Sequence, residues 1–158
     1  MTRKTLTIFA TVSSLVLATA AGADGHLSRE QQGAISARQA QMTLFGFNLG
    51  PLGAMVQGNI PYDAETAATA AANLAALASI NEDRYWLEGT DASVGGTRAK
   101  AEIWSDPEGF AAQLAKLSET TTALAAVAGD GLEALQGAFG AVGGTCGACH
   151  EAYRAPRS

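Results

Sequence analysis

Two cysteines and a histidine near the end of the chain constrain its fold more than any other feature. Cys146, Cys149 and His150 form the pattern C-x-x-C-H, in which two thiols add to the vinyl groups of a haem and the neighbouring imidazole binds the iron. The chain has no other cysteine, so a haem attached here leaves none for a structural disulfide. Nearly the whole chain precedes the motif, so most of the fold has to be built around a group held at its C-terminal end.

The apolar residues that lead to this motif follow a helical period. They step by three and four through Leu132, Leu135, Phe139, Val142, Cys146, Cys149 and Tyr153. The pattern predicts a helix with both thiols on its buried face, and His150, four residues after Cys146, projects to the same side. Residues 130–133 have a spacing like that of a capping box and predict the start of this helix.

A second apolar stripe, in the first half of the chain, predicts another helix. Its members are Ile35, Arg38, Met42, Phe45, Leu49, Leu52 and Val56. The helix is expected to begin at about Ser28 and to end in the upper forties. Gly46, Gly50, Pro51 and Gly53 disfavour its continuation.

Two more helices are predicted between these. Asp63 is the expected N-cap of the first, and Asp106, with Pro107 at the first helical position, begins the other. Residues 81–100 are polar, contain three glycines and predict a long connection. We therefore expect an all-α fold, an antiparallel four-helix bundle with a covalently attached haem near the C-terminus.

The N-terminus has the features of an export signal. Arg3 and Lys4 precede an apolar stretch over residues 6–17, which is too short for a comfortable membrane span. Small residues at 21–23 then match the site that a signal peptidase cuts. We expect a signal peptide over residues 1–23, with an uncleaved anchor as the competing interpretation. Export to the bacterial periplasm is consistent with a c-type haem, because its thioethers form outside the cytoplasm.

Charge restricts the partners of the mature protein. Removing residues 1–23 leaves 135 of the 158 residues, enough for the single domain that we expect over 24–158. The formal net charge then changes from −5 to −7, because Arg3 and Lys4 are lost. This argues against nucleic acid and an anionic membrane surface and favours redox partner proteins that are basic or neutral.

Other uses of a C-x-x-C pattern fit less well. A redox dithiol of the thioredoxin kind expects a βαβ setting, which this helical pattern lacks. A zinc site needs four ligands, and beyond Cys146, Cys149 and His150 only His26 remains. Haem attachment is therefore the favoured interpretation.

Arg38 and Met42 are the upstream residues that a haem would explain. An arginine on an apolar stripe is costly unless it is paired or reaches water, and a haem propionate would pair with Arg38 in fork geometry. The alternative is that Arg38 extends to water at the end of the bundle. Met42 is either the sixth iron ligand or a flexible apolar residue that shields an open iron face.

Several short stretches together resemble the cytochrome c′ family across the mature chain. They are residues 37–39 with Met42, 58–64, 97–100, 102–104, 139–146 and 149–154. The resemblance implies one haem c, with His150 as the proximal iron ligand and Arg38 and Gln39 beside the propionates. Arg98 falls where other members often have an acidic residue beside the haem.

The resemblance also bears on function. It implies a homodimer, usually packed through the first two helices, and Met42 on the distal side of the haem. The chain resembles the low-spin relatives, in which a methionine sulfur binds the iron, as closely as it resembles the five-coordinate members, which bind NO and CO. We therefore expect a periplasmic mono-haem cytochrome that transfers single electrons, with capture of nitric oxide as the alternative. No catalytic set is present in the sequence, so we do not expect an enzyme.

Overall fold

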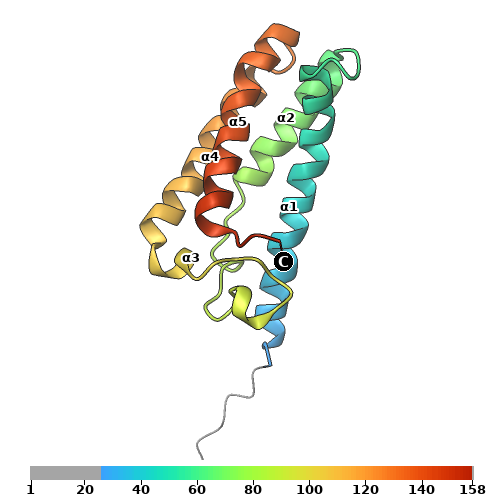
Figure 1. The fold of residues 1–158 in the computed structure, drawn as a ribbon. Helices are drawn as coiled ribbons and strands as arrows, with labels where there is room; N and C mark the ends of the chain where they lie inside the picture. The colour runs from blue at the N-terminus through green and yellow to red at the C-terminus, as the bar shows by residue number, and fades with distance from the viewer. Residues whose placement is uncertain (1–25, 158) are drawn as a thin grey trace, which may run out of the picture.

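Four long helices form the structure of the chain, a computed structural model that describes residues 26–157. They are α1 (Arg29–Val56), α2 (Ala64–Ala78), α4 (Pro107–Val127) and α5 (Leu132–Tyr153). Successive long helices run in opposite directions along the bundle (Figure 1), which confirms the predicted antiparallel four-helix bundle. The predicted signal peptide lies outside the described residues.

Three of the long helices begin where the sequence predicts, α1 at Ser28 and α2 and α4 at the predicted caps Asp63 and Asp106. Ser28 accepts a hydrogen bond from the backbone of Gln31 and forms a complete capping box with it. Asp63 accepts from the N–H of Thr66 at 2.7 Å, and Asp106 accepts from the N–H of Gly109 at 3.1 Å. A side-chain oxygen at each of these positions satisfies an N–H that has no partner within the helix.

The prediction that α1 ends in the upper forties is wrong, because the helix continues through Pro51 to Val56. A proline inside a helix removes one hydrogen bond and costs roughly 3 kcal/mol. Burial compensates here, since Leu52 and Met55 are 0% and 2% exposed. Burying a side chain of that size stabilises by roughly 1.5–3 kcal/mol, so the two together offset the cost of the proline.

The capping interpretation for α5 is also wrong, because its N-cap is Gly131 and makes no side-chain capping bond. The hydroxyl of Tyr62 satisfies this turn instead. It accepts from the N–H of Gly131 at 3.0 Å and donates to the carbonyl of Ala128 at 2.9 Å. Leu132, expected on the buried face, is 37% exposed because it begins the helix at the end of the bundle.

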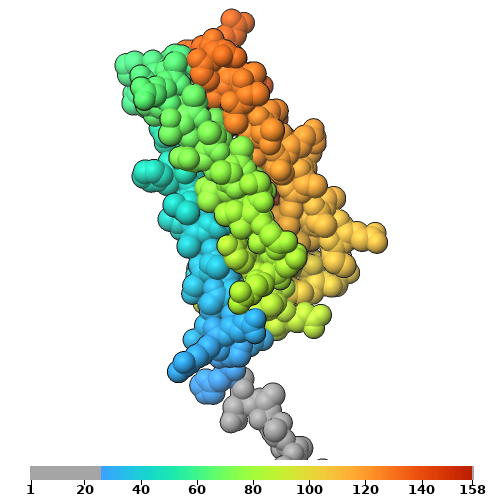
Figure 2. Space-filling view, turned by 180° about the vertical axis from the view of Figure 1, so that it is seen from behind, coloured from blue at the N-terminus to red at the C-terminus, as the bar shows by residue number. Residues whose placement is uncertain are grey.

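The helices enclose two apolar clusters. The main cluster fills the bundle and contains Phe45, Leu52, Leu74, Leu124, Leu135 and Val142 among its buried members. On the far side of the molecule α2 lies between α1 and α4 (Figure 2). None of the helices in the described range is long and apolar enough to cross a membrane.

The long connection between α2 and α4 closes one end of the bundle. It contains the 3₁₀ turn η1 (Ala92–Val94) and the short helix α3 (Glu102–Ser105), which the sequence analysis did not predict. A second apolar cluster lies at this end and includes Ile103, Phe110 and Tyr153. The connection therefore supplies one wall of the region that faces the cysteine motif.

Candidate functional site

The two cysteines lie one turn apart near the end of α5 and are both free and half-buried. Cys146 packs against the main core cluster, whereas Cys149 packs against the second cluster, which includes Trp86 and Phe110. Burial raises the pKa of both thiols, because removal from water disfavours a thiolate. The sequence predicted both thiols on the buried face of this helix, and in the structure the two thiols are partly buried.

His150 lies in the last turn of α5 and is also half-buried. Burial lowers the pKa of His150, and the charges of Arg154 and Arg98 lower it further. Each of these effects disfavours the imidazolium form. The imidazole is therefore kept neutral near pH 7, and a neutral imidazole has the free ring nitrogen that a metal ion needs.

Three aromatic rings form a continuous stack beside Cys149. Trp86 and Phe110 meet edge to face with centroids 4.9 Å apart, and Phe110 meets Tyr153 in the same way at 5.3 Å. The Tyr153 hydroxyl donates to Asp106 Oδ2 at 2.7 Å. This bond raises the pKa of Tyr153 to about 12, because the carboxylate stabilises the protonated phenol. The stack joins α4, α5 and the long connection into one rigid wall.

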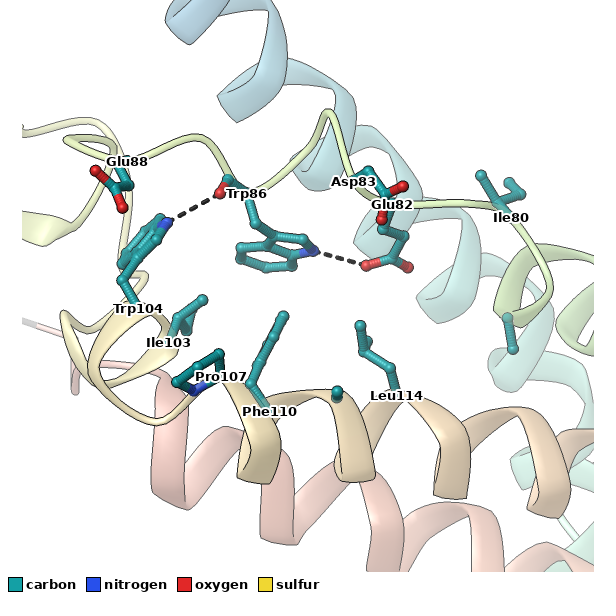
Figure 3. A pocket seen from close by; sticks show the side chains of 12 residues that line it. Ile80, Glu82, Asp83, Trp86, Glu88, Ile103, Trp104, Pro107, Phe110 and Leu114 are labelled. Atoms are coloured by element: carbon teal, nitrogen blue, oxygen red, sulfur yellow. Dashed lines mark hydrogen bonds between the residues drawn. The ribbon is translucent and has the colours of Figure 1, made fainter.

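A cavity of about 480 Å³ opens along this wall. In Figure 3, Phe110 and Leu114 project from α4 toward Trp86 on the long connection. Trp86 Nε1 donates to Glu82 Oε2 at 2.7 Å, and Trp104 Nε1 donates to the Trp86 carbonyl at 2.9 Å. Apolar side chains form most of the cavity wall, and the carboxylates of Glu82, Asp83 and Glu88 also line it.

Arg38 is 3% exposed and reaches into the long connection. Its guanidinium donates to Tyr85 O at 3.2 Å, to Thr90 Oγ1 and O at 2.9 and 2.5 Å, and to Thr97 Oγ1 at 2.9 Å. Its Cζ also lies 4.8 Å from the centroid of the Trp86 ring. These contacts account for the buried charge within the chain itself, and pairing with a propionate stays a prediction.

Gln39 holds the long connection against α1, and Arg98 holds it against the residues after α5. Gln39 Nε2 donates to Gly96 O at 2.7 Å. Arg98 Nε donates to Ala155 O at 2.8 Å, and the N–H of Ala155 donates back to Arg98 O at 2.8 Å. Arg98 therefore fastens the C-terminal segment to the loop, a role that the resemblance did not suggest.

Met42 is 39% exposed and lies at the edge of the buried row of α1. That row runs through Arg38, Gln41, Phe45 and Asn48. The helical period places position 41 at the centre of this row and position 42 at its edge. Whether Met42 binds iron or shields it stays a prediction.

Sequence reasoning missed a polar pair, Gln41 and Glu82, of which Glu82 lines the cavity. Gln41 is 4% exposed and its Nε2 donates to Glu82 Oε1 at 2.7 Å and to Leu77 O at 3.0 Å. Gln41 Oε1 is buried without a hydrogen-bond partner in the described part of the chain. A glutamine on an apolar helix face was the one available signal, because its partner is distant in sequence.

These observations fit a covalently attached porphyrin. Two free thiols one turn apart match the two vinyl groups, and an apolar wall adjoins Cys149. A Cβ added at Gly143, Gly144 or Gly147 would meet no atom within 4 Å, so the surface of α5 around the thiols is open. Within residues 26–157 no group of three His, Cys, Asp or Glu side chains is placed to hold a metal ion by itself.

Comparisons with known proteins agree with the geometry. A family model described as cytochrome c′ matches residues 33–154. Cytochrome c′ of Cereibacter sphaeroides is 37% identical over 99 residues, which cover 62% of this chain and 66% of the relative. Cytochrome c′ of Halomonas halodenitrificans is 40% identical over 99 residues, covering 61% and 74%. The solved structure of cytochrome c′ from Thermochromatium tepidum is similar with a TM-score of 0.74 and 32% identity, and the match covers 82% of this chain and 98% of that one.

Proposed function

This chain belongs to the cytochrome c′ family, and we propose that it is a periplasmic cytochrome that carries single electrons. Members of the family bind one covalently attached c-type haem, and the chain has the two cysteines for it. The observation that carries the proposal is the placement of Cys146, Cys149 and His150 within two turns of α5, beside an apolar wall. When bound, the haem supplies an iron that alternates between the ferric and ferrous states.

The chain's own residues would prepare the site in three ways. Cys146 and Cys149 would fix the porphyrin, and the neutral imidazole of His150 would bind its iron. The aromatic stack of Trp86 and Phe110 would exclude water from one side. A dry and rigid setting reduces the reorganisation that each change of charge requires and helps to set the potential.

Arg38 and Gln39 would act at the edge of the site. Arg38 holds the long connection against α1 through four hydrogen bonds, and Gln39 binds the same connection at Gly96. We propose that both also lie close to the propionates. In this role they would fix the loop that closes the end of the bundle.

Nitric oxide or carbon monoxide binding is the second candidate function. Met42 is 39% exposed and lies at the edge of the buried row of α1. One similar solved structure is a nitric oxide complex of a variant of the cytochrome c′ from Alcaligenes xylosoxidans. An iron whose distal side is open or easily vacated would bind such gases at this site.

Optical spectra of the haem-loaded protein separate the two functions. A low-spin ferrous spectrum that carbon monoxide does not change supports electron transfer with Met42 bound. A high-spin spectrum that shifts fully with carbon monoxide supports gas binding. Met42→Ala converts low spin to high spin if the sulfur is a ligand, and leaves the spin state unchanged if it only shields the iron.

We also propose that the protein is a homodimer that uses α1. Phe47 and Leu44 lie on one face of that helix and are 77% and 48% exposed. A solved relative shows ligand-controlled dimer dissociation. Sedimentation equilibrium tests the proposal with Phe47→Asp, which should yield monomers because it places a charge in an apolar interface. An unchanged dimer would show that another surface is used.

A further inference from the structure

Four basic residues gather at the end of the bundle where α5 finishes. We define them as the basic corner: Arg98, Lys100, Arg154 and Arg157. Arg98 and Lys100 belong to the segment that pairs with the residues following α5. Two ion pairs of 4.0 Å or less occur in the described range, and neither involves the basic corner. Within residues 26–157 its four charges therefore form no ion pair, although Glu151 lies in the last turn of α5.

Backbone contacts hold part of the basic corner in place. Lys100 Nζ donates to the carbonyls of Glu151 and Ala152 at 2.8 and 3.1 Å, at the helix end that favours a positive charge. Arg98 is fixed to the carbonyl of Ala155. These carbonyl oxygens carry no formal charge, so the hydrogen bonds position the cations without neutralising them.

The basic corner borders the residues that attach the haem. The N–H of Arg154 donates to the carbonyl of His150 at 3.1 Å, and Ala99, which lies between Arg98 and Lys100, pairs with Arg154. Arg154 itself is exposed one turn after His150. A protein that bound the basic corner would thus lie beside the half-buried imidazole, where the path for an electron to the surface is short.

We propose that the basic corner is the docking surface for an acidic patch on a redox partner protein. The proposal rests on the proposed electron-transfer function. A formal net charge of −7 after removal of residues 1–23 favours basic or neutral partners at long range. Salt screens such interactions beyond about 8–10 Å under physiological conditions. Charges at the point of contact then decide orientation and partner choice, and the basic corner presents four positive ones.

Oxidation of the ferrous, haem-loaded protein by reagents of opposite charge tests the local field. Stopped-flow absorbance gives the rate constants for hexacyanoferrate(III), an anion, and tris(phenanthroline)cobalt(III), a cation. Each reaction moves one electron from the ferrous iron to the reagent, giving ferric protein and hexacyanoferrate(II) or the cobalt(II) complex. Both reagents oxidise the same iron, so a change in its potential affects both rates in the same direction. The ratio of the two rates reports the local charge.

The expected result is a rate with the anion that falls as ionic strength rises, despite the negative net charge. The double substitution Arg154→Gln with Arg157→Gln should lower the anion-to-cation ratio roughly three- to ten-fold at low ionic strength and little at high ionic strength. Lys116→Gln is the matched control, because Lys116 lies on α4 and pairs with Glu119 at 2.9 Å. It should leave the ratio nearly unchanged.

Three results would overturn the proposal. The first is an anion rate that rises with ionic strength, and the second is a ratio that Lys116→Gln changes as much as the double substitution does. The third is a failure to adsorb on an electrode coated with carboxylate-terminated thiols, where the native protein should give a voltammetric signal that the double variant loses. If neither reagent oxidises the ferrous protein within seconds at any ionic strength, the proposed electron-transfer function is wrong. This failure is distinct from that of the docking proposal, in which oxidation occurs but depends on salt in the opposite way.

Discussion

Replacing Arg38 with Met removes a buried charge that ties α1 to the long connection. The guanidinium donates four hydrogen bonds, two of them to the carbonyls of Tyr85 and Thr90. A hydrogen bond from a charged group contributes about 1.5–3 kcal/mol, and relief of the buried charge offsets part of this loss. We expect Arg38→Met to lower the free energy of unfolding by about 3 kcal/mol.

Urea unfolding of the haem-loaded protein, followed by circular dichroism at the helix band, measures this loss. A double-mutant cycle with Thr90→Val should give a coupling energy of about 1 kcal/mol, because one bond in the network joins the two side chains. Arg84→Met is the matched control, since the Arg84 side chain is 84% exposed, and it should leave the midpoint unchanged. A loss below about 1 kcal/mol for Arg38→Met would refute the assigned role.

Three further predictions concern titration and backbone conformation. The pKa of Tyr153 is raised to about 12 from 10.0, so its contribution to stability is complete below pH 10 and is lost as the pH rises toward 12. Tyr153→Phe should remove this decrease of the unfolding free energy with pH, which unfolding curves measured at alkaline pH would show. The N-cap hydrogen bonds lower the pKa of Asp63 below 3.8, so its contribution is present above that pH and is lost in acid. Asp63→Ala should therefore lower the melting temperature at pH 7 but converge with the native protein near pH 2. Gly137→Ala should raise the free energy of unfolding by about 0.5–1 kcal/mol, because a Cβ there meets nothing within 4 Å, whereas Ala at Gly131, with φ of 134°, should lower it.

Features that depend on neighbouring residues in sequence could be predicted. The caps at Ser28, Asp63 and Asp106 follow from an oxygen placed just before a helix. The cysteine motif was recognisable because its chemistry needs a fixed short spacing. These features require no knowledge of the rest of the fold.

Features that depend on distant contacts could not be predicted. The helix α1 continues through Pro51 because Leu52 and Met55 are buried by other helices. Gln41 binds Glu82 across 41 residues, a contact that no local pattern encodes.

The central claim is that one haem is bonded to Cys146 and Cys149. Intact mass spectrometry of protein exported by a host with haem-maturation machinery tests it most directly. The expected mass is that of the polypeptide plus one haem, retained in acidified organic solvent. A mass of polypeptide alone, with both thiols open to alkylation, would contradict the claim.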